Sequence, residues 1–558
     1  MTACVAALVA IDLGLRWSFL APRLVTVRGF ANYAGAVVVL AIVLRLSMLL
    51  PRYARVPLLA VVVAVPLAIQ TAMFRAYGQF VQPTDFVLFS QSPSAVFSAV
   101  RPGAGTVDAV PLIVLVAAFA AAWLLPSEAK PLRAAFIALG TMIVAVLLGL
   151  GATYWDAAPT LEHPQAAFAS SLVGLLHRNA VLSRSGAHVV IPPMSHDGPR
   201  PNVVLVLGES LAASHLTFYG YERDTSPRLQ RLFDEQAFVA FRDATVMGPN
   251  TRTSLPYIFT GVEGPDAHGR VFRAPTLLEY AKARGYHTAF ISAQEESWGS
   301  LDVFFREGAD TFRSGIAFAA NVDVMDGADD IDVLERGVLP TLQTIAEPFF
   351  IVLHMNGGHA PYAYHSRPTS KVFLPEDRVN SINAYDNTVH ETDEYLARVL
   401  EALRARDANA WMFFTSDHGQ PLGDGYAFFN RGYQESITRD PLLVFAPTPD
   451  RPRFAAISGA QVAACDLAPT ILDVIGAPVA WPMDCVDWLS NPDAMRSRVR
   501  VVSAYTPAGV TEPTMLLVLE DGKRELFDLA RGTVDFQESG TRRVSDVSLP
   551  PKIAERLR

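Results

Sequence analysis

Two segments far apart in the chain end in side chains that can bind a metal ion. Asn202 to Ser210 reads NVVLVLGES, and Trp411 to Gly419 reads WMFFTSDHG. Apolar runs of this kind are typical of strands buried on both faces, and the carboxyl ends of parallel strands meet at one crevice. We therefore expect Glu209, Asp417 and His418 to converge there. Carboxylate and imidazole groups are the ligands that Zn²⁺ accepts where Cys is absent.

Two further segments carry chemistry that suits the same crevice. A third expected strand ends at His354, and the glycines of HMNGGHAP allow a tight loop that brings His359 toward the site. The hydroxyl-rich segment Gly248 to Pro256, GPNTRTSLP, is expected to open a helix. A metal lowers the pKa of a bound hydroxyl, so a Thr in this segment becomes a nucleophile, and a helix N-terminus binds phosphate oxygens.

Each of these motifs has a simpler structural interpretation when it is taken alone. An Asp-His-Gly sequence is more often structural than metal-binding, and a Thr/Ser cluster before Pro is usually a helix cap. A Glu after a strand is often a cap or a salt-bridge partner. Their joint order, a carboxylate, a hydroxyl cluster, a His-rich loop and Asp-His, is much more specific than any one of them.

From Asn202 onward the hydrophobic pattern alternates between strand and helix periods. Apolar strands that alternate with helices indicate an α/β domain with a mostly parallel sheet covered on both faces. The expected strands are Val203 to Leu207, His287 to Ala293, Phe349 to His354, Trp411 to Ser416 and Leu442 to Ala446. The expected helices are Ser226 to Glu235, Thr276 to Arg284, Val379 to Arg406 and Leu467 to Ile475.

The C-terminal part of the sequence predicts antiparallel strands. Val499 to Tyr505 has a strand pattern, and Met515 to Leu529 reads as a hairpin that turns at Asp521-Gly522. We expect these strands to be added at an edge of the main sheet.

The 558 residues are too many for one core, and the charge is divided unevenly along them. Residues 1–155 hold 10 basic and 4 acidic residues, which gives +6, and the remainder holds 36 basic and 51 acidic residues, which gives −15. An acidic remainder excludes nucleic acid as an expected partner, because phosphate neutralisation needs a basic surface.

The N-terminal part predicts about five membrane-spanning helices. Uncharged runs near the roughly 20 residues that a bilayer core requires are Val56 to Phe74, Ala109 to Ser127 and Ala134 to Trp155. Gly29 to Leu44 and Thr2 to Leu20 complete the set, although Asp12 and Arg16 interrupt the last one. Buried helices of a soluble protein are the disfavoured alternative. Met1 stands almost within an apolar run, so we expect the true start to lie upstream.

Three regions follow from this pattern. Residues 1–157 are expected to form a transmembrane helical domain, residues 158–201 an interfacial helix and linker, and residues 202–558 the catalytic domain. Gln82 to Val100 and Pro164 to Asn179 are amphipathic and are expected either to lie in the membrane interface or to pack as ordinary connecting helices. Basic residues occur in both sets of loops, so the positive-inside rule does not decide the orientation.

The three cysteines, Cys4, Cys465 and Cys485, exclude a disulfide framework and a thiolate zinc site. Cys465 and Cys485 could pair in an oxidising compartment. Two unpaired, small apolar side chains are an equally good interpretation, and the sequence leaves both open.

Taken together, the motifs resemble the alkaline phosphatase and sulfatase superfamily, and the whole chain resembles the bacterial inner-membrane phosphoethanolamine transferases that modify lipid A or related surface glycans. The segments that carry this resemblance, besides those quoted above, are GYERDTSPR at residues 220–228, YDNT at residues 385–388 and SDHG at residues 416–419. The five-helix membrane domain of that family covers the remaining N-terminal part. Coverage of the chain by the resemblance is nearly complete.

The resemblance implies roles for individual residues. Glu209, Thr251, Asp417 and His418 would bind one catalytic Zn²⁺, and a second ion is possible. Thr251 would be the nucleophile rather than its neighbours Thr253 and Ser254. His359 would act at the phosphate or at a second metal. Substrate contacts would fall to Asn250, Arg252 and His354.

The chain also departs from the family pattern. The lipid A enzymes have a cysteine on either side of the nucleophile segment, where this chain has Met247 and Tyr257. They also carry a further His about twelve residues after Asp-His-Gly, whereas residues 420–431 contain none. Arg252 replaces a small residue. These differences leave the zinc and threonine chemistry in place and weaken the assignment of the head group and acceptor.

We therefore expect zinc-dependent transfer of phosphoethanolamine from phosphatidylethanolamine to lipid A or another cell-envelope glycan, through a phospho-threonine. The resemblance places the multi-pass protein in the inner membrane with its catalytic domain in the periplasm. A phosphoglycerol transferase would differ only in head group, and the sequence gives no oligomeric state. A sulfatase is disfavoured because no Cys/Ser-x-Pro-x-Arg stands at the nucleophile. A non-catalytic membrane sensor on a degenerate fold is disfavoured because all four zinc groups are present.

Overall fold

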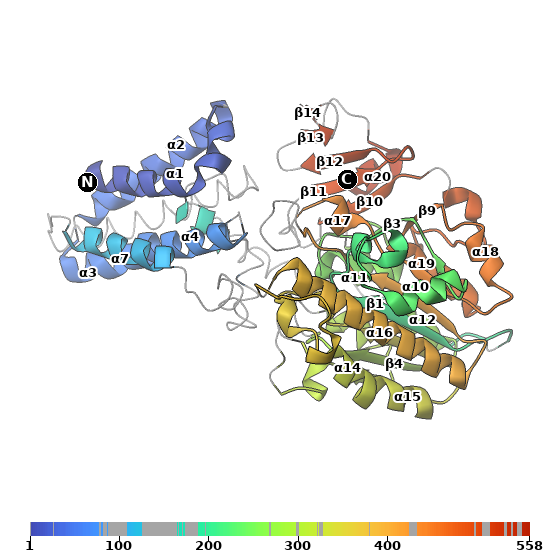
Figure 1. Ribbon diagram of the computed structural model, residues 1–558. Coiled ribbons are helices and arrows are strands. Elements are labelled where there is room, and N and C mark those ends of the chain that lie inside the picture. Colours follow the sequence, from blue (N-terminus) through green and yellow to red (C-terminus); the bar gives the residue numbers. More distant parts are fainter. Residues whose placement is uncertain are drawn as a thin grey trace. The chain divides into compact units, whose positions relative to one another are not determined.

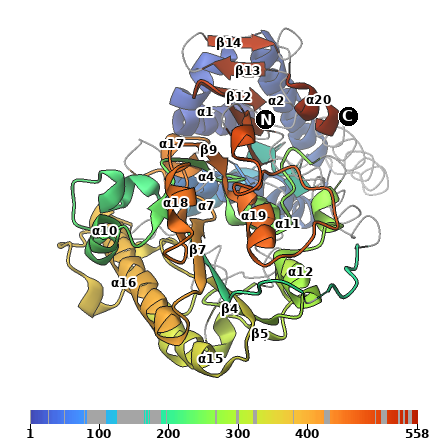
Figure 2. The ribbon, with the colours of Figure 1, turned by 90° about the vertical axis from the view of Figure 1, so that its right-hand side faces the viewer.

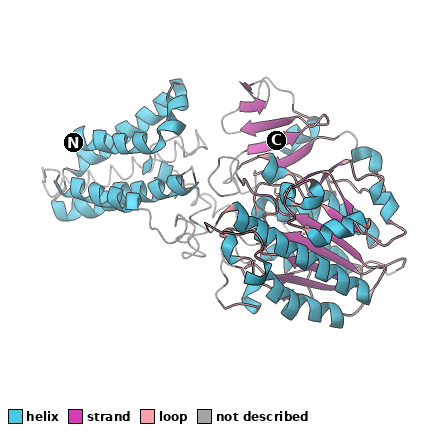
Figure 3. Ribbon diagram, viewed as in Figure 1, coloured by secondary structure: helices cyan, strands magenta, loops and turns pink. Residues whose placement is uncertain are grey.

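The computed structural model describes most of the chain, which divides into two compact units, Met1–Val181 and Leu182–Arg558. The described residues are 2–25, 27–48, 50–77, 80–81, 86, 109–124, 164–165, 167–169, 171–172, 188–195, 197–266, 269–296, 301–320, 322, 327–378, 380–422, 432–495, 498–504, 514–528, 533–536, 540–543 and 549–557. The described residues of the first unit are mainly helical, and the second unit combines strands with helices (Figure 3).

The first unit is built from apolar helices. They are α1 (Thr2–Leu24), α2 (Val27–Ser47), α3 (Arg52–Leu59), a π-helical turn (Ala60–Ala64), α4 (Val65–Tyr77) and α7 (Ala109–Leu124). Leu8, Leu44, Leu59 and Leu67 meet in a common apolar cluster. The continuous helix Arg52–Phe74 is long and apolar enough to cross a membrane, and Tyr33–Ser47 is a shorter apolar helix.

Some of the expected membrane spans are helices in the structure, and one lies outside the described residues. Three expected runs, which begin at Thr2, Gly29 and Val56, are helical throughout their described residues, and the run from Ala109 is helical as far as Leu124. Ala134 to Trp155 lies outside the described residues, as does almost all of Gln82 to Val100. One described helix meets the criteria for a span, so the total of five remains a prediction.

The two charged residues that interrupt the first expected span neutralise each other. Arg16 donates to both carboxylate oxygens of Asp12 at 2.7 Å, one turn away on α1, and Tyr33 of α2 donates to the same carboxylate at 2.8 Å. The Arg16 guanidinium also lies 4.1 Å from the centre of the Phe80 ring. A paired and hydrogen-bonded ion pair costs far less to bury than separate charges, which explains how α1 tolerates both residues.

The second unit is organised around a seven-stranded sheet with the order β2-β8-β7-β1-β6-β4-β5. Its strands are β1 (Val203–Gly208), β2 (Val239–Ala240), β4 (His287–Ser292), β5 (Thr311–Arg313), β6 (Phe349–His354), β7 (Trp411–Ser416) and β8 (Leu443–Phe445). The strands β7, β1, β6, β4 and β5 are parallel, and β8 runs antiparallel to β7. The predicted α/β architecture with a mostly parallel sheet is confirmed.

Helices cover both faces of this sheet. The helices α11 (Thr251–Thr260), α12 (Leu277–Ala283) and α19 (Leu467–Val474) pack on one face, and α10 (Pro227–Asp234), α14 (Asp330–Val333), α15 (Leu339–Thr344) and α16 (Ile382–Arg406) pack on the other (Figures 1 and 2). Alternate residues of β1 divide between the two apolar clusters, with Leu205 and Leu207 on the first face and Val204 and Val206 on the second. This division explains why the strand is apolar at every position.

Each strand and helix expected between residues 202 and 475 is present, with bounds that differ by at most a few residues. The strands expected near the C-terminus are present too, as β10 (Arg500–Ser503), β11 (Thr514–Val518) and β12 (Arg524–Asp528), all antiparallel. The prediction that they join an edge of the main sheet was wrong. With β13 (Thr533–Phe536) and β14 (Gly540–Arg543) they form a separate five-stranded sheet.

The separate sheet has an apolar cluster of its own. Its inner face buries Val501, Leu517 and Phe527 in an apolar cluster that does not include residues of the main sheet. It is attached to the rest of the second unit through Ser503, whose backbone N–H donates to the carbonyl of Met247 at 2.9 Å, and through a buried Arg500 that pairs with Asp243 at 2.7 Å.

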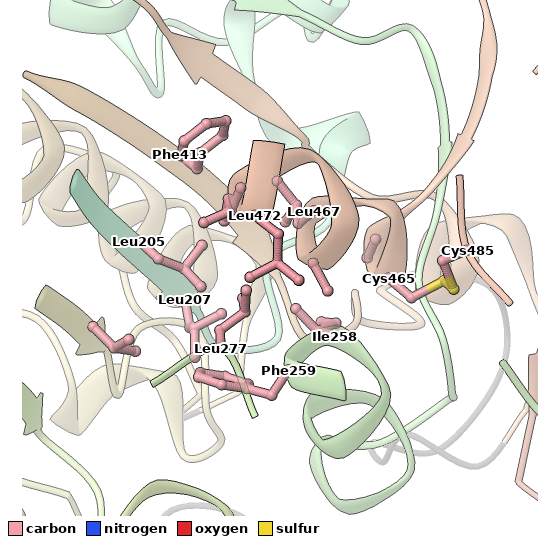
Figure 4. Packing of buried hydrophobic residues seen from close by; sticks show 14 of the residues in the cluster. Leu205, Leu207, Ile258, Phe259, Leu277, Phe413, Cys465, Leu467, Leu472 and Cys485 are labelled. Carbon is pink, nitrogen blue, oxygen red and sulfur yellow. A yellow bond between two sulfur atoms is a disulfide. The ribbon is translucent and has the colours of Figure 1, made fainter. Parts of the chain in front are cut away.

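Cys465 and Cys485 form a disulfide, which decides the question that the sequence left open. The bond joins the segment before α19 to the chain that follows it, at the margin of the cluster that holds Leu467, Leu472 and Ile258 (Figure 4). In a chain-entropy model, closing a loop of this size stabilises the fold by about 3 kcal/mol.

Glu391 on α16 is a buried carboxyl that predicts a specific dependence of stability on pH. Burial raises the pKa of Glu391 to about 7. Hydrogen bonds from the backbone N–H of Arg367 and the hydroxyl of Ser370 lower the pKa but do not cancel the effect of burial. A carboxyl whose pKa is raised in the folded state contributes stability below its unfolded pKa, and that contribution is lost as pH rises toward 7. We expect Glu391→Gln to raise the free energy of unfolding at pH 8 by up to about 3 kcal/mol and to change it little at pH 4.

Thermal unfolding of the full chain in detergent between pH 4 and pH 8 measures this difference. Glu394→Gln on the same helix is the matched control, because the Glu394 side chain is 29% exposed. An equal shift at both pH values in the Glu391 variant contradicts the prediction.

Candidate metal centre and active site

Strand register brings the first two acidic residues together. In the β1–β7 pair Gly208 lies opposite Ser416, so Glu209 and Asp417 both follow the last paired position of adjacent parallel strands. Both side chains are almost completely buried, with exposures of 1% and 0%. Two carboxylates held side by side away from water repel each other, so this edge of the sheet needs positive charge.

Hydrogen bonds fix the orientation of both carboxylates. One oxygen of Asp417 accepts from the backbone N–H groups of Ser210 and His418, at 2.9 and 2.7 Å. The Ser210 hydroxyl donates to Oε1 of Glu209 at 2.5 Å. The second oxygen of Asp417 is buried and makes no hydrogen bond of good geometry within the described part of the chain, which marks it as the atom directed into the site.

Thr251 is the first residue of α11, as the sequence predicted for the hydroxyl-rich segment. Asn250 caps the helix, because its side-chain oxygen accepts from the backbone N–H of Thr253 at 3.1 Å. The Thr251 hydroxyl lies 3.2 Å from Oε2 of Glu209 and 3.4 Å from Nε2 of His418. The predicted nucleophile therefore contacts two of the predicted metal ligands.

His418 presents one defined nitrogen to this cluster. Its Nδ1 lies 2.9 Å from the carbonyl oxygen of Gly419, so Nδ1–H donates there and Nε2 faces Asp417 at 3.1 Å and Glu209 at 3.7 Å. Burial lowers the pKa of His418, but the charge of Asp417, the close contact with that carboxylate and the charge of Glu209 raise it to about 9. Burial likewise opposes ionisation of Asp417, whereas His418 lowers the pKa of that carboxyl to about 2.

The donor set fits a zinc ion. One ligand atom each from Glu209, Asp417 and His418 lies within 4.8 Å of the others, and the Thr251 hydroxyl adjoins them. Two carboxylates, one imidazole and a hydroxyl are nitrogen and oxygen ligands of the kind that zinc accepts in catalytic sites. The negative charge that favours a proton on His418 favours a metal cation in the same position. The inward-facing oxygen of Asp417 supports this assignment.

Gln294 and Glu296 belong to the site, and neither was predicted from the sequence. They follow β4, whose Ser292 lies opposite His354 of β6. Gln294 Nε2 donates to Oε2 of Glu209 at 2.9 Å and to the carbonyl of Met355 at 2.8 Å. It therefore orients a predicted metal ligand. The signal that could have revealed it was its position directly after a predicted strand of the same sheet.

His354 lies beside the metal cluster and is held by Glu296. Its Nδ1 is 2.6 Å from the buried Glu296 carboxylate, and its Nε2 is 3.2 Å from Nε2 of Gln294. Burial lowers the pKa of His354, but the charge of Glu296 and the hydrogen bond to it raise the pKa to about 9. His354 is thus a buried imidazole that Glu296 orients, and Gln294 lies between it and Glu209.

His359 lies on the loop that follows, nearer to solvent. Its Nδ1 is 2.8 Å from the carbonyl of Ala360, which leaves Nε2 as the atom available to a ligand. Asp330 fixes the loop by accepting from the backbone N–H groups of Asn356 and Gly357 at 2.8 and 2.7 Å. A side chain at Gly358 would meet the Tyr385 ring at 2.9 Å, so this glycine is required by close packing.

The departures from the family pattern have structural counterparts. Met247 and Tyr257 are both buried in the apolar cluster behind α11, so apolar packing occupies the region where the related enzymes have cysteines. Arg252 is partly buried in the first turn of α11, next to the predicted nucleophile. Residues 423–431, where the further His of the family would fall, lie outside the described part of the chain.

Comparison with known proteins finds similar chains. A model of the Sulfatase family matches residues 201–477. Phosphatidylethanolamine transferase Mcr-1 from Escherichia coli is 27% identical over 254 residues, which are 41% of this chain and 44% of that protein. The chain therefore spans less than half the length of this curated relative.

Two solved structures share the fold. The integral membrane lipooligosaccharide phosphoethanolamine transferase A from Neisseria meningitidis has a TM-score of 0.61 and 17% identity, with coverage of 85% of this chain and 95% of that one. The zinc complex of the C-terminal periplasmic domain of EptC from Escherichia coli has a TM-score of 0.50 and 20% identity, with coverage of 60% and 97%. At these identities the likeness concerns the fold alone.

A parallel sheet with carboxylates, a helix-opening threonine and Asp-His at its edge, together with the sulfatase match, defines a member of the alkaline phosphatase superfamily. Within that superfamily, the curated relatives that match part of the chain include phosphoethanolamine transferases of Escherichia coli and Helicobacter pylori.

The contact between Gln294 and Glu209 predicts an effect on metal affinity. We expect Gln294→Ala to weaken zinc binding by roughly 10- to 100-fold, because partners that orient a metal ligand contribute about that much. Competition with a chelating dye, together with zinc content by mass spectrometry, measures this change. Gln461→Ala, on a strand outside the site, is the control, and equal affinities for the two variants would show that Gln294 does not orient the ligand.

Proposed function

We propose that the protein transfers phosphoethanolamine from phosphatidylethanolamine to lipid A or another cell-envelope glycan, with Thr251 as the nucleophile. The observation that carries this proposal is the Thr251 hydroxyl, which lies within 3.4 Å of both Glu209 and His418 at the N-terminus of a capped helix. The phosphoethanolamine transferases among the relatives support the choice of head group.

We further propose that Glu209, Thr251, Asp417 and His418 hold one Zn²⁺, which agrees with the zinc complex of a protein that shares the fold. When bound, zinc lowers the pKa of the nucleophile and neutralises charge that develops on phosphorus. The family resemblance also allows a second ion near His354 or His359.

In the first half-reaction, the Thr251 oxygen forms a bond to the phosphorus of the donor, and the bond from phosphorus to the diacylglycerol oxygen breaks. The Thr251 proton passes to a neighbouring acceptor, for which Oε2 of Glu209 at 3.2 Å is placed. Nε2 of His359 is the atom that can protonate the leaving oxygen, because Nδ1 is engaged by Ala360. The backbone N–H groups at the start of α11 bind the phosphate oxygens.

In the second half-reaction, an acceptor hydroxyl or phosphate attacks the phosphorus of phospho-Thr251 and releases the threonine. Arg252 is proposed to bind phosphate oxygens. His354 is proposed to act on the substrate from a distance, because its ring nitrogens face Glu296 and Gln294. The side-chain oxygen of Asn250 is engaged as a helix cap, so a substrate contact by Asn250 falls to its amide nitrogen.

The proposed location follows from the substrates. Both donor and acceptor are lipids, and the apolar helix Arg52–Phe74 suits a protein that stays with them in a membrane. The solved relatives that share the fold include an integral membrane enzyme and a periplasmic domain. We propose an inner-membrane protein with its catalytic unit in the periplasm.

The nucleophile is tested by trapping the intermediate. Treatment of the zinc-loaded full chain with phosphatidylethanolamine is expected to add one phosphoethanolamine to the peptide that contains Thr251, detected by mass spectrometry. Thr251→Ala is expected to lose this adduct and to reduce diacylglycerol release by roughly 10³-fold or more. Thr253→Ala, two residues along the same helix, is the control, and its adduct should remain. An adduct on any other residue would reject Thr251.

The donor is tested with two fluorescent lipids, phosphatidylethanolamine and phosphatidylglycerol, supplied separately in detergent with Zn²⁺. We expect diacylglycerol from the first lipid only. Release from the second lipid alone would identify a phosphoglycerol transferase of the same superfamily. Release from neither lipid, by protein with a full zinc content, would favour a non-catalytic sensor.

A further inference from the structure

Exposed apolar side chains are concentrated in one short segment of the second unit. Tyr364, Val372, Leu374 and Ile382 expose 69%, 53%, 66% and 43% of their surface. These four residues occur within 19 positions, whereas the other large exposed hydrophobics among the described residues of this unit, Val190, Ile316 and Val479, are scattered. Soluble surfaces rarely gather such side chains unless they contact a partner or a membrane. We call these four residues the 364–382 patch.

Hydrogen bonds show that the segment is folded into one surface. Lys371 donates from Nζ to the carbonyl of Ala363 at 2.7 Å, which brings the chain beside Tyr364 next to Val372. The side-chain oxygen of Asn387 on α16 accepts from the backbone N–H groups of Val372 and Phe373 at 2.9 and 2.8 Å. The turn is thereby fastened to the first part of α16, the helix that begins at Ile382. The patch is an ordered feature.

The patch adjoins the candidate active site. The same chain runs from His359 to Tyr364 in five residues, and the ring centres of His359 and His365 are 6.3 Å apart. His365 Nδ1 also lies 2.7 Å from the amide nitrogen of Asn356, on the loop that carries His359. A molecule with its phosphate at His359 would therefore have this segment as a neighbour.

The charge of the segment differs from that of the rest of the unit. Residues 360–382 contain three basic residues and two acidic ones, which gives +1, against −15 for residues 156–558 as a whole. The three basic residues all pair with carboxylates, Arg367 with Asp329 and Asp332, Lys371 with Glu376 and Arg378 with Asp377, so the segment is close to neutral. Tyrosine and aliphatic side chains in one exposed and nearly neutral segment are the composition of a surface that lies against a zwitterionic lipid.

We propose that the 364–382 patch inserts into the lipid surface beside the active site and receives the glycerol and acyl part of the phospholipid donor. The inference rests on the proposed function for the identity of the donor. In this position Tyr364 and Leu374 would replace water around the upper part of the acyl chains. With the patch in the lipid surface, the phosphate would have a shorter distance to leave the bilayer before it reaches Thr251.

The experiment places a polarity-sensitive nitrobenzoxadiazole label at Leu374→Cys in the full chain. The background carries Cys4→Ser, and Cys465 and Cys485 remain in their disulfide. The protein is held in nanodiscs of phosphatidylethanolamine and phosphatidylglycerol, with or without a nitroxide-labelled phospholipid. We expect blue-shifted emission that the nitroxide lipid quenches strongly. The control is the same label at Val479→Cys, a residue 53% exposed near α12 and α19 on the opposite face of the sheet, and it should show neither effect.

Quenching at position 374 no greater than at position 479 overturns the proposal. Blue-shifted emission without lipid quenching also overturns it, because a protein surface, such as a second copy of the chain, would then cover the patch. This readout needs no catalytic turnover, so its result stands whether or not the enzyme releases diacylglycerol.

Kinetics give a second test that separates the patch from the chemistry. Leu374→Glu is expected to raise KM for phosphatidylethanolamine in vesicles about tenfold, since an apolar side chain would no longer enter lipid, and to leave kcat near the wild-type value. A soluble phosphoethanolamine ester with a nitrophenyl leaving group in place of diacylglycerol should be used equally by both proteins. Equal KM values in vesicles overturn the inference, and inactivity of the wild-type enzyme toward both donors would instead reject the proposed function.

Discussion

The structure of the catalytic unit depends on the burial of two carboxylates at the ends of adjacent parallel strands. Glu209 and Asp417 are placed together by the register of β1 and β7, and neither has water to screen its charge. Such a pair is stable only with compensating positive charge. The backbone N–H groups of Ser210 and His418, the imidazole of His418 and the amide of Gln294 supply part of it. We propose that a divalent cation supplies the remainder.

The surrounding structure serves to hold this arrangement in one geometry. Behind it, α11 and α19 pack on β1 in a cluster that the Cys465–Cys485 disulfide borders. On the other face, Tyr385 of α16 donates to the carbonyl of Ser210 at 2.7 Å and accepts from the N–H of Ala212 at 2.8 Å. Asp330 and Gly358 fix the histidine loop. The Thr251 hydroxyl and its neighbours are thus positioned by helices from both faces of the sheet.

The sequence predicted the parts of this site that a strand pattern exposes. Glu209, Asp417 and His418 follow continuous apolar runs that are typical of buried strands, and the hydroxyl-rich segment was expected to open a helix. The choice of Thr251 within that segment came from the family resemblance. Gln294 was not predicted as a site residue because an amide after a strand carries no distinctive motif, although its place at the same sheet edge was predictable. The separate C-terminal sheet could not be foreseen, because alternation shows which face of a strand is buried but not which sheet it joins. The family resemblance supplied the residue roles, which geometry alone does not assign.

The strand order also has a consequence for biogenesis. Glu209 and Asp417 are neighbours in space but are separated by 208 positions in the chain, and the strand that carries Asp417 is the later one to be made. At the usual rate of about 5 to 20 residues per second, the ribosome needs roughly 10 to 40 s to pass from the first carboxylate to the second. A chain in synthesis therefore presents no competent zinc site until most of it has emerged. Metal loading at the proposed site is then confined to a late stage of synthesis, after the N-terminal helices have been made.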